Sequence, residues 1–282
     1  MIAAWAVDEH TVEAASKAVD LGFVSATLVG DAKMIAEVCG KHGIDIAKFE
    51  IVDNPDELKA VAQAVKMVHD GEGDVLMKGL CSTDKFLRAI LNKETGLLPP
   101  KALLSHVGVI ESPNYHKLLF LTDMAVVPLP DLKQKMTLTN YVVKVAKSFG
   151  IAKPKVAFVA ASEQVLASMP ACLEAAALAK MADRGQIKGC IADGPLALDV
   201  AIDQESVEIK KLTSPVAGDA DCLVFPNIES ANVFWKTNSK LADGVRQAGM
   251  LVGTTAPCIL ASRADSVDTK LNSIAEAVLS VL

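Results

Sequence analysis

The chain is predicted to adopt an α/β fold in which parallel strands alternate with covering helices. Short β-rich runs alternate with alanine-rich helical segments along most of the 282 residues, which is typical of βαβ units. Hydrophobic residues make up 51% of the chain and aromatic residues only 4%. The core must therefore consist mainly of aliphatic side chains, as in parallel sheets that are covered on both faces. The length suffices for one large domain or two ordinary ones.

The first part of the chain shows the most regular alternation. Strands are expected at residues 2–7, 25–30, 49–53 and 74–79, and helices at residues 10–22, 31–43, 54–71 and 81–91. Gly22 suits the C-cap of the first helix. Asn54 is expected to cap the third helix, with Pro55 at its first position. This order predicts a doubly wound sheet.

The pattern changes after Gly96. Two β-rich runs, 103–112 and 117–128, flank the turn-favouring segment SPNYH. Beyond them, helices are expected at 131–150, 170–185, 229–244 and 268–282, and strands at 155–161, 187–194, 220–227 and 258–261. Because no Ser/Gly linker, repeat or low-complexity tract is present, any two domains must be joined by short connections, near 122–132 and 250–258.

Composition limits the class of function. The net charge is −6 and no basic block stands out, which disfavours nucleic-acid binding. The six cysteines are scattered without a Cys-x-x-Cys pair, which argues against a zinc site or a disulfide framework. The first residues lack a secretory n-region, and no uncharged run approaches the ~20 residues of a membrane span. We therefore expect a cytoplasmic protein that binds neither membrane nor nucleic acid.

The first candidate site is the segment MKGLCSTDKFLRAIL. A strand ends at Lys78, and Ser82 and Thr83 precede a helix that carries Arg88. Unpaired N–H groups and the dipole make a helix N-terminus an anion site, to which these side chains would add donors and charge. The alternative is that one hydroxyl only caps the helix while Arg88 is a surface side chain.

The second candidate is APCILASRADS, where Ser262, Arg263 and Asp265 follow a short apolar run. Ligands bind beyond the carboxyl ends of strands in open α/β sheets, and a guanidinium suits phosphate or carboxylate oxygens. The alternative is that Asp265 caps the last helix and pairs with Arg263. Cys258 lies nearby, but the sequence supplies no partner base, and a buried structural thiol is the simpler interpretation.

Two further segments carry polar residues at expected strand ends. In CIADGPLALD, Asp193 and Gly194 stand at a strand exit and Asp199 lies further on, although Asp193 could simply cap a helix that starts at Pro195. The other segment surrounds a strand with small or amide residues, for which a plain turn is the alternative: Ser214, Gly218, Asn227 and Asn232. The sequence contains neither of the glycine motifs that bind nucleotides and no H-E-x-x-H motif. A metal-dependent decarboxylating dehydrogenase would need an aspartate cluster for the metal and a nucleotide site, and the sequence shows no convincing example of either.

Taken together, these segments resemble the phosphate acetyl/butyryltransferase family. The resemblance runs through KGLCSTDKFLRAIL, KLLFLTDMAVVPLPDLKQK, IADGPLALDVA, SPVAGDADCLVFPNIESANVFWK and ILASRADS, in the family's order. DGPLALD and SRADS are closer to the butyryltransferase branch. The resemblance implies two doubly wound domains with an interdomain cleft, similar to isocitrate/isopropylmalate dehydrogenase. It places the first domain at 1–127 and 257–282, and the second at 128–256.

The family's activity and site residues follow from the same resemblance. Members convert acyl-CoA and phosphate into acyl phosphate and CoA without a metal or prosthetic group, usually as homodimers or larger assemblies. The family's Ser-Arg pair corresponds to Ser262 and Arg263, at the reacting groups. The remaining motif positions, which would contact CoA or phosphate, correspond to Lys78, Ser82, Thr83, Arg88, Asp193, Gly194 and Asp199. The acidic residue that acetyltransferases use as the thiol base corresponds to Thr269, so Asp265 is the substitute expected here.

These motifs predict a phosphate butyryltransferase that works by direct transfer in a ternary complex. Arg263 would hold phosphate, Ser262 would donate to the sulfur or the carbonyl oxygen, and Asp265 would act as the base. Two alternatives stay open: a phosphate acetyltransferase with acetyl-CoA as its main substrate, and a non-catalytic acyl-CoA sensor.

Overall fold

The computed structural model describes residues 1–260 and 265–282, which form two compact units. Unit 1 comprises Met1–Leu104 and Ala248–Leu282, and unit 2 comprises Ser105–Gln247. The chain therefore leaves unit 1, builds unit 2 and returns to complete unit 1. The sequence predicted one domain at 1–127 and 257–282 and a second at 128–256. These limits stay a prediction.

Unit 1 is a mixed α/β unit whose strands run in the order β3-β2-β1-β4-β11-β10. The strands are β1 (Ile2–Ala4), β2 (Ala26–Gly30), β3 (Phe49–Asp53), β4 (Leu76–Lys78), β10 (Arg246–Val252) and β11 (Cys258–Ile259). The helices are α1 (Glu9–Asp20), α2 (Ala32–His42), α3 (Glu57–His69), α4 (Thr83–Ile90) and α10 (Val267–Val281), with a 3₁₀ turn at Ile46–Lys48. The adjacent strands β3, β2, β1, β4 and β11 all run parallel, whereas β10 pairs with β11 in the antiparallel sense.

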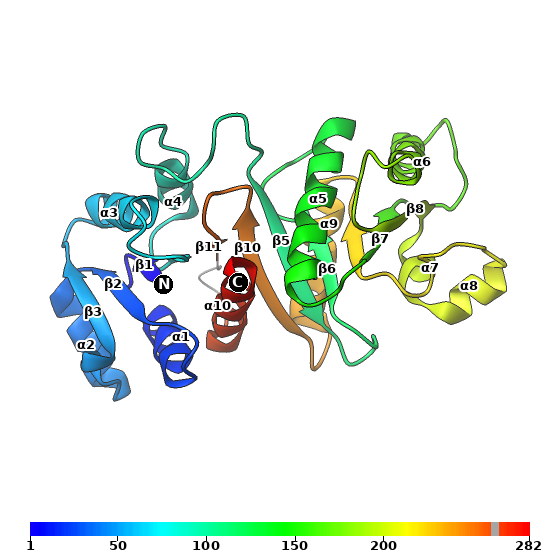
Figure 1. The fold of residues 1–282 in the computed structure, drawn as a ribbon. Coiled ribbons are helices and arrows are strands. Elements are labelled where there is room, and N and C mark those ends of the chain that lie inside the picture. Colours follow the sequence, from blue (N-terminus) through cyan, green and yellow to red (C-terminus); the bar gives the residue numbers. More distant parts are fainter. Residues whose placement is uncertain (261–264) are drawn as a thin grey trace. The chain divides into compact units, whose positions relative to one another are not determined.

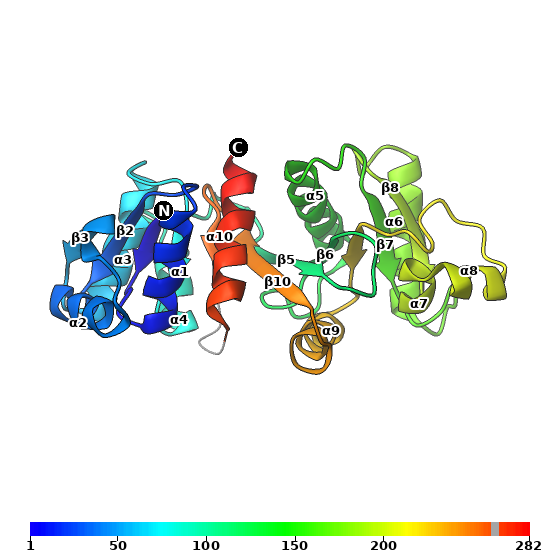
Figure 2. The same ribbon diagram turned by 90° about the horizontal axis from the view of Figure 1, so that it is seen from below.

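The helices of unit 1 cover its strands on both faces. Figure 1 shows α3 and α4 on one side of the strands and α1, α2 and α10 on the other. Figure 2 shows the C-terminal α10 beside the N-terminal α1, and the two helices are in extensive contact. The buried strand residues are aliphatic, as Ile2, Leu28 and Leu76 illustrate, which agrees with the composition. The last helix is thus part of the core of unit 1.

Unit 2 is built on strands in the order β5-β6-β9-β7-β8. The strands are β5 (Ser105–Glu111), β6 (Leu119–Thr122), β7 (Lys155–Val159), β8 (Ile191–Leu196) and β9 (Cys222–Val224). The helices are α5 (Leu132–Ser148), α6 (Pro170–Asp183), α7 (Leu198–Ile202), α8 (Gln204–Lys210) and α9 (Ile228–Leu241). The adjacent strands β6, β9, β7 and β8 run parallel, whereas β5 and β6 form an antiparallel pair.

The core of unit 2 lies between its strands and the helices that follow β8 and β9. Side chains of β5–β9 pack there against α7, α8 and α9, with Leu121, Leu223 and Val200 fully buried. The ring of Trp235 packs against Gly108 at the rim of this core. A Cβ at Gly108 would lie only 2.7 Å from Trp235 Cζ3, so the position has no room for a side chain. Helices α5 and α6 contact the strands on their other side (Figure 1).

Three local predictions were wrong. Strand β10 lies where only a connection was expected, because its RQAGMLV run was not recognised as a strand. Helix α3 begins at Glu57 and is capped by Asp56, whose Oδ1 accepts from Lys59 N at 3.1 Å, so Asn54 is not its cap. Residues 191–196 are a continuous strand, so Pro195 does not start a helix and Asp193 does not cap one.

Candidate active site

The carboxyl ends of three neighbouring strands bring two of the predicted motifs to one edge of unit 1. Strands β1, β4 and β11 are adjacent and parallel, with Ala4 opposite Lys78 and Ile259 opposite Met77. The segments that follow them lead into α1, α4 and α10, so three helices begin at this edge. The strand before the serine-threonine motif and the strand before the Ser-Arg motif in the chain are therefore neighbours. We call this the carboxyl edge of unit 1.

Ser262 and Arg263 lie outside the described residues. Their neighbours do not: Ile259 ends β11, and Asp265 is a partly buried residue just before α10. The cap of α10 is Ser266, whose Oγ accepts from Thr269 N at 3.1 Å. The alternative in which Asp265 caps this helix is therefore wrong.

Lys78 lies beneath the carboxyl edge and not on its surface. Its side chain is 1% exposed, and its Nζ donates to Gly79 O at 3.3 Å. Gly79 itself is forced by packing, because a Cβ there would lie 2.3 Å from Trp5 O and 2.8 Å from Ala4 O. The charge of the Lys78 ammonium acts on the nearby thiol of Cys81, where it partly opposes the rise in pKa that burial causes.

Ser82 caps α4, as the structural alternative for this motif predicted. Its Oγ accepts from Lys85 N at 3.3 Å, and Thr83 is the first residue of the helix. Arg88 is 80% exposed and donates from Nη2 to Asp84 Oδ2 at 3.0 Å, one turn earlier. Capping by Ser82 leaves other N–H groups of the first turn available. Binding of CoA or phosphate by these residues stays a prediction.

Sequence analysis overlooked a buried lysine at the same edge. Lys270, in the first turn of α10, is 2% exposed. Burial lowers its pKa, and the charges of Asp8 and Asp265 act in the opposite direction. A lysine near a helix N-terminus opposes the helix dipole, and that conflict was the available signal.

Cys258 is unsuited to nucleophilic catalysis. Its side chain is fully buried at the start of β11, and its Sγ lies 3.3 Å from Ala256 O. Burial raises the pKa of the thiol to about 12, although Thr254 opposes this by hydrogen bonding. The thiolate population at neutral pH is therefore negligible. This supports the interpretation of Cys258 as a small buried core residue.

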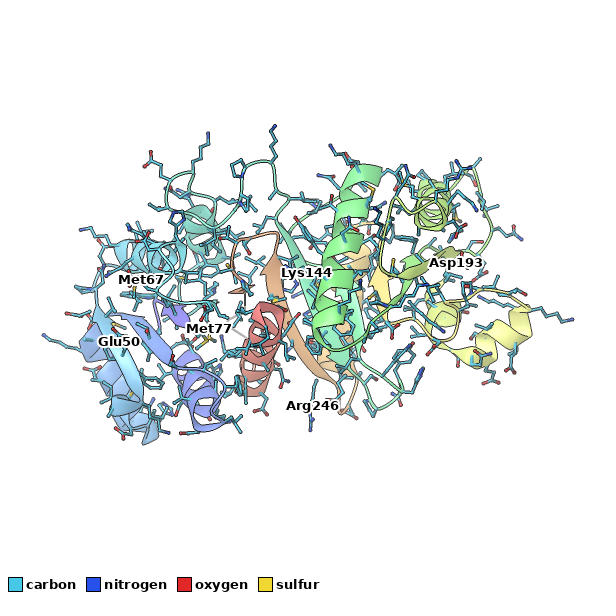
Figure 3. The ribbon with its side chains drawn as sticks, viewed as in Figure 1. Glu50, Met67, Met77, Lys144, Asp193 and Arg246 are labelled. Atoms are coloured by element: carbon cyan, nitrogen blue, oxygen red, sulfur yellow. The ribbon has the colours of Figure 1, made fainter. Side chains whose placement is uncertain are left out.

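The aspartate-glycine motif belongs to unit 2. Asp193 lies within β8 (Figure 3), and its Oδ1 accepts from Gly194 N at 2.8 Å. Packing explains Gly194, since a Cβ there would lie 2.7 Å from Phe158 Cβ. Asp199, at the start of α7, accepts from Lys210 at 2.8 Å, and this hydrogen bond is the main cause of its lowered pKa. Contact of these residues with a substrate stays a prediction.

The fourth motif has a structural explanation throughout. Ser214 accepts from two backbone N–H groups, Gly218 adopts a φ of 74°, and Asn227 caps α9 by accepting from Ser230 N at 3.0 Å. Asn232 donates from Nδ2 to Met124 O at 2.9 Å. These residues shape turns and a helix start, so the interpretation as plain turns suffices.

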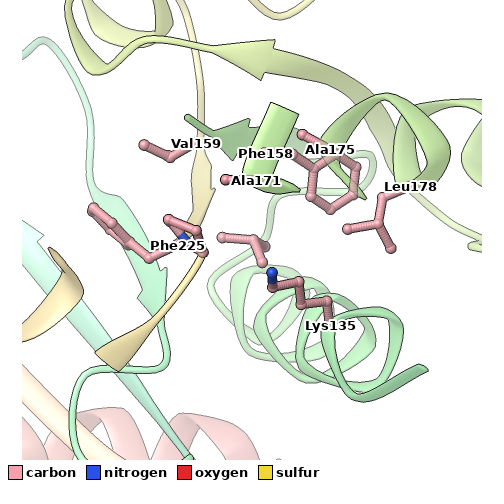
Figure 4. Close-up of a pocket in the computed structure, with 9 residues that line it drawn as sticks. Lys135, Phe158, Val159, Ala171, Ala175, Leu178 and Phe225 are labelled. Atoms are coloured by element: carbon pink, nitrogen blue, oxygen red, sulfur yellow. The ribbon is translucent and has the colours of Figure 1, made fainter. Parts of the chain in front are cut away.

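A small hollow opens at the carboxyl ends of β7 and β9 in unit 2 (Figure 4). Residues of these strands, α5 and α6 line it, and its cavity volume is only about 10 Å³, which is the space of a single water molecule. Its walls are apolar apart from Lys135, whose side chain is 6% exposed and forms an ion pair with Glu174. Across the parts of the chain that the structure describes, no cluster of His, Cys, Asp and Glu is arranged to hold a metal ion, and no helix meets the length and hydropathy of a membrane span.

The strand order defines a class of protein: an α/β protein whose parallel strands alternate with helices and lead at their carboxyl ends into the segments that carry polar motifs. A model of the family described as phosphate acetyl/butaryl transferase matches residues 56–278. The chain belongs to this family.

Individual relatives agree with the family assignment. The chain is 49% identical over 274 residues to a phosphate butyryltransferase of Clostridium acetobutylicum, covering 97% of this chain and 90% of the relative. It is 40% identical to a phosphate acetyltransferase of Rhizobium meliloti, covering 99% and 87%. Among solved structures, a branched-chain phosphotransacylase from Enterococcus faecalis superposes with a TM-score of 0.86 at 27% identity, covering 100% and 99%.

Proposed function

We propose that this protein transfers a short acyl group between coenzyme A and inorganic phosphate, with butyryl-CoA as the preferred thioester. The observation that supports the proposal is the register of β4 and β11, which lays the strand preceding the Ser-Arg motif in the chain directly beside the strand preceding Ser82 and Thr83. The family membership and the 49% identity to a phosphate butyryltransferase support it. The 40% identity to a phosphate acetyltransferase keeps acetyl-CoA as the second candidate.

The reaction requires stabilisation of two changes in charge. In the direction of acyl-CoA synthesis, the CoA thiol loses its proton, and its sulfur bonds to the carbonyl carbon. The bond from that carbon to the phosphate oxygen then breaks, and phosphate leaves with the electron pair. A free thiol has a pKa of about 8.5, so a base or a cationic field must raise the thiolate fraction. No metal or prosthetic group takes part in the proposed steps.

Each named residue meets one of these demands. Arg263 holds the phosphate oxygens bidentately as charge grows on them. Ser262 donates to the sulfur or to the carbonyl oxygen, and Asp265 accepts the thiol proton. One such fixed donor is typically worth about 3–4 kcal/mol of transition-state stabilisation. The helix N-terminus of α4, with Ser82 and Thr83, and the buried charge of Lys78 favour the anionic parts of CoA and phosphate.

Two variants test direct transfer. Arg263→Ala should lower kcat about 10²- to 10³-fold, because a charge-stabilising donor is lost. Cys258→Ala should leave kcat nearly unchanged, because that thiol is buried and protonated. Phosphate-dependent release of CoA from butyryl-CoA measures both. Abolished turnover in Cys258→Ala, with labelled acyl group retained on the wild-type protein, would replace the ternary complex by a covalent intermediate.

The same assay distinguishes the competing functions. A panel of acetyl-, propionyl-, butyryl- and branched acyl-CoA should show the highest kcat/KM with butyryl-CoA, since each methylene in an apolar pocket is worth about 1–3 kcal/mol. Flat activity across the panel would refute the butyryl preference and keep the acyltransferase. Tight binding of acyl-CoA without any turnover would favour the sensor.

The finer architecture and the assembly are also part of the proposal. We propose two doubly wound domains of the isocitrate/isopropylmalate dehydrogenase type. The strand order within each unit supports this, as does a 4-hydroxythreonine-4-phosphate dehydrogenase from Klebsiella pneumoniae with a TM-score of 0.58 and 11% identity. The family resemblance supports a homodimer or larger homo-oligomer in the cytoplasm, and light scattering on the purified protein tests the subunit count.

A further inference from the structure

We propose that two copies of this chain associate through α9, with the two helices antiparallel about a two-fold axis. The surface is the exposed side of α9 that bears Val233, Thr237 and Leu241, which we call its outer face. The inference concerns assembly, so it goes beyond the acyl-transfer reaction and rests on no step of it. Two observations support it: an apolar stripe on this face, and charges of opposite sign at the two ends of the helix.

Helix α9 packs more shallowly against its unit than the other long helices that the structure describes. Only Ala231 of its 14 residues is buried, whereas α5 buries seven residues of 17 and α1 six of 12. Among the described helices, none packs extensively against α9, and Figure 2 shows it at the outer side of the strands of unit 2. A helix of this length usually buries a wider apolar face. Within one copy of the described chain, the outer face of α9 is therefore uncovered.

The outer face carries exposed apolar side chains along its length. Val233, Thr237 and Leu241 recur every four residues and so lie on one side of the helix. Val233 is 64% exposed and Leu241 is 83% exposed. Another exposed leucine, Leu129, directly follows the residue whose carbonyl oxygen accepts from Ile228 N, at the start of α9. Aligned apolar exposure of this kind is typical of a helix that another protein surface covers.

Charged side chains follow one flank of this stripe, with opposite signs at the two ends of α9. Glu229 lies in the first turn, and Lys236 and Lys240 follow seven and 11 residues later on the same flank. All three side chains are exposed, and none of them forms an ion pair within residues 1–260 and 265–282. The helix therefore presents one acidic end and one basic end beside an apolar stripe.

This pattern is complementary to itself in one orientation. When two identical helices run antiparallel about a two-fold axis, each flank faces the same flank of the other helix. Glu229 of each copy then lies opposite Lys240 of the other copy, so both ends of the pair are compensated at once. Leu241 of each copy lies opposite the start of the other α9, where Leu129 is exposed. A parallel pair would instead place Glu229 against its own copy, so the charges select a second copy in the antiparallel orientation.

Lysine substitutions on the outer face test whether it holds two copies together. Size-exclusion chromatography with light scattering, over a range of protein concentrations, should show an even number of subunits in the wild type. Val233→Lys and Leu241→Lys should each raise the Kd of association at least about 100-fold, because an unpaired ammonium would be buried. The matched control is Ile209→Lys on α8, at a side chain that is 73% exposed, and it should leave the Kd unchanged. Circular dichroism verifies that each variant is folded.

Charge reversal tests the antiparallel orientation. Glu229→Lys and Lys240→Glu should each raise the Kd about 10-fold, because the two-fold axis makes every change twice. The double variant Glu229→Lys/Lys240→Glu should recover most of the affinity, because both ion pairs form again with reversed signs. Glu205→Lys, which reverses an exposed acidic residue in the first turn of α8, is the control and should not change the Kd.

Three outcomes would overturn the inference. They are a wild type that stays monomeric at every concentration, association that neither lysine substitution weakens, and a double charge variant that associates no better than the single ones. The first would show that copies of the chain do not pair, the second that another surface joins them, and the third that α9 does not pair antiparallel. Absence of phosphate-dependent CoA release from the wild type would refute the proposed function and would leave the subunit count, and hence this inference, unaffected.

Discussion

Glu276 should make the folded protein less stable as the pH rises, and replacing it should remove this dependence. The side chain lies in α10 and is 1% exposed. Within the described residues, neither carboxylate oxygen has a hydrogen-bond partner. Burial alone raises the pKa of this carboxyl well above its ordinary 4.5. Folding therefore favours the protonated acid.

The sign of the effect follows from proton binding. Above pH 4.5 the unfolded chain releases this proton, while the folded chain keeps it up to the raised pKa. Within that window the unfolded state binds fewer protons, so the free energy of unfolding falls by about 1.4 kcal/mol per pH unit. Below pH 4.5 both states are protonated and the dependence disappears. The remaining cost there is that of a buried, unpaired polar group, about 1–3 kcal/mol.

Thermal unfolding of Glu276→Met between pH 4 and pH 8 tests this account. The variant should unfold at a higher temperature than the wild type, and the difference should widen by roughly 3–6 °C per pH unit, from about 2–4 °C per kcal/mol for a chain of this size. Glu37→Gln, which changes an exposed glutamate in α2, is the control and should follow the wild type. A variant less stable than the wild type at pH 8, or a difference independent of pH, would show that Glu276 is ionised and compensated.

Four further changes test other parts of the structure. Gly194→Ala should destabilise unit 2 by about 1–3 kcal/mol in denaturant titration, because its Cβ would lie 2.7 Å from Phe158 Cβ; an unchanged midpoint would contradict this. Asp123→Ala should cost at least about 3 kcal/mol by the same measurement, since a 3% exposed carboxylate that accepts from Ser105 Oγ and from four backbone N–H groups is lost. Asp219→Asn should lower Tm at pH 7, because hydrogen bonds from Lys117, Lys155 and His116 depress the pKa of Asp219 and stabilise its carboxylate in the folded state. The difference in Tm between wild type and variant should shrink as the pH falls below 3.8. A difference that does not change with pH would refute this account. Ser82→Asp should keep the cap of α4 and hence Tm, but should raise KM for CoA and phosphate if the helix start binds an anion; an unchanged KM would leave Ser82 as a cap only.

Periodicity was sufficient to predict most elements because the local signals agree with the tertiary structure. The helix expected at 31–43 occurs as Ala32–His42, with Asp31 as its N-cap and Gly43 in the left-handed region at φ 64°. The strand expected at 49–53 occurs as Phe49–Asp53. In both cases a capping or turn residue stands where the apolar pattern changes, so sequence and structure define the same limits.

The misses occurred where local signals were weak or where packing overrode them. The strand β10 contains Gln247 and Gly249, which lower its β propensity, although burial among neighbouring strands stabilises it. Asn54 and Pro55 matched the signature of a helix start, but Asp56 directly precedes the first helical residue, Glu57, and caps α3 instead. Asp193 and Pro195 also matched a helix start, yet β8 pairs with β7 up to Asp193 and again, after a shift in register, at Leu196.

The candidate site divides in a similar way. The presence of strands at 74–79 and 258–261 and of a helix at 81–91 was predictable from apolar runs, although β4 ends at Lys78, β11 at Ile259, and α4 begins at Thr83. Their proximity was not predictable, because it depends on β11 pairing with β4 across 180 residues of chain. The buried state of Lys78 depends on side-chain packing, which has no periodic signal in the sequence.

Helix α10 carries two buried ionisable groups, and they have different consequences. Lys270 lies in its first turn, where burial lowers its pKa and the charges of Asp8 and Asp265 act in the opposite direction. Glu276 lies six residues further along, about 9 Å along the helix axis from Lys270, and no neighbouring charge shifts its pKa. Methionine at position 276 should therefore raise stability without lowering kcat.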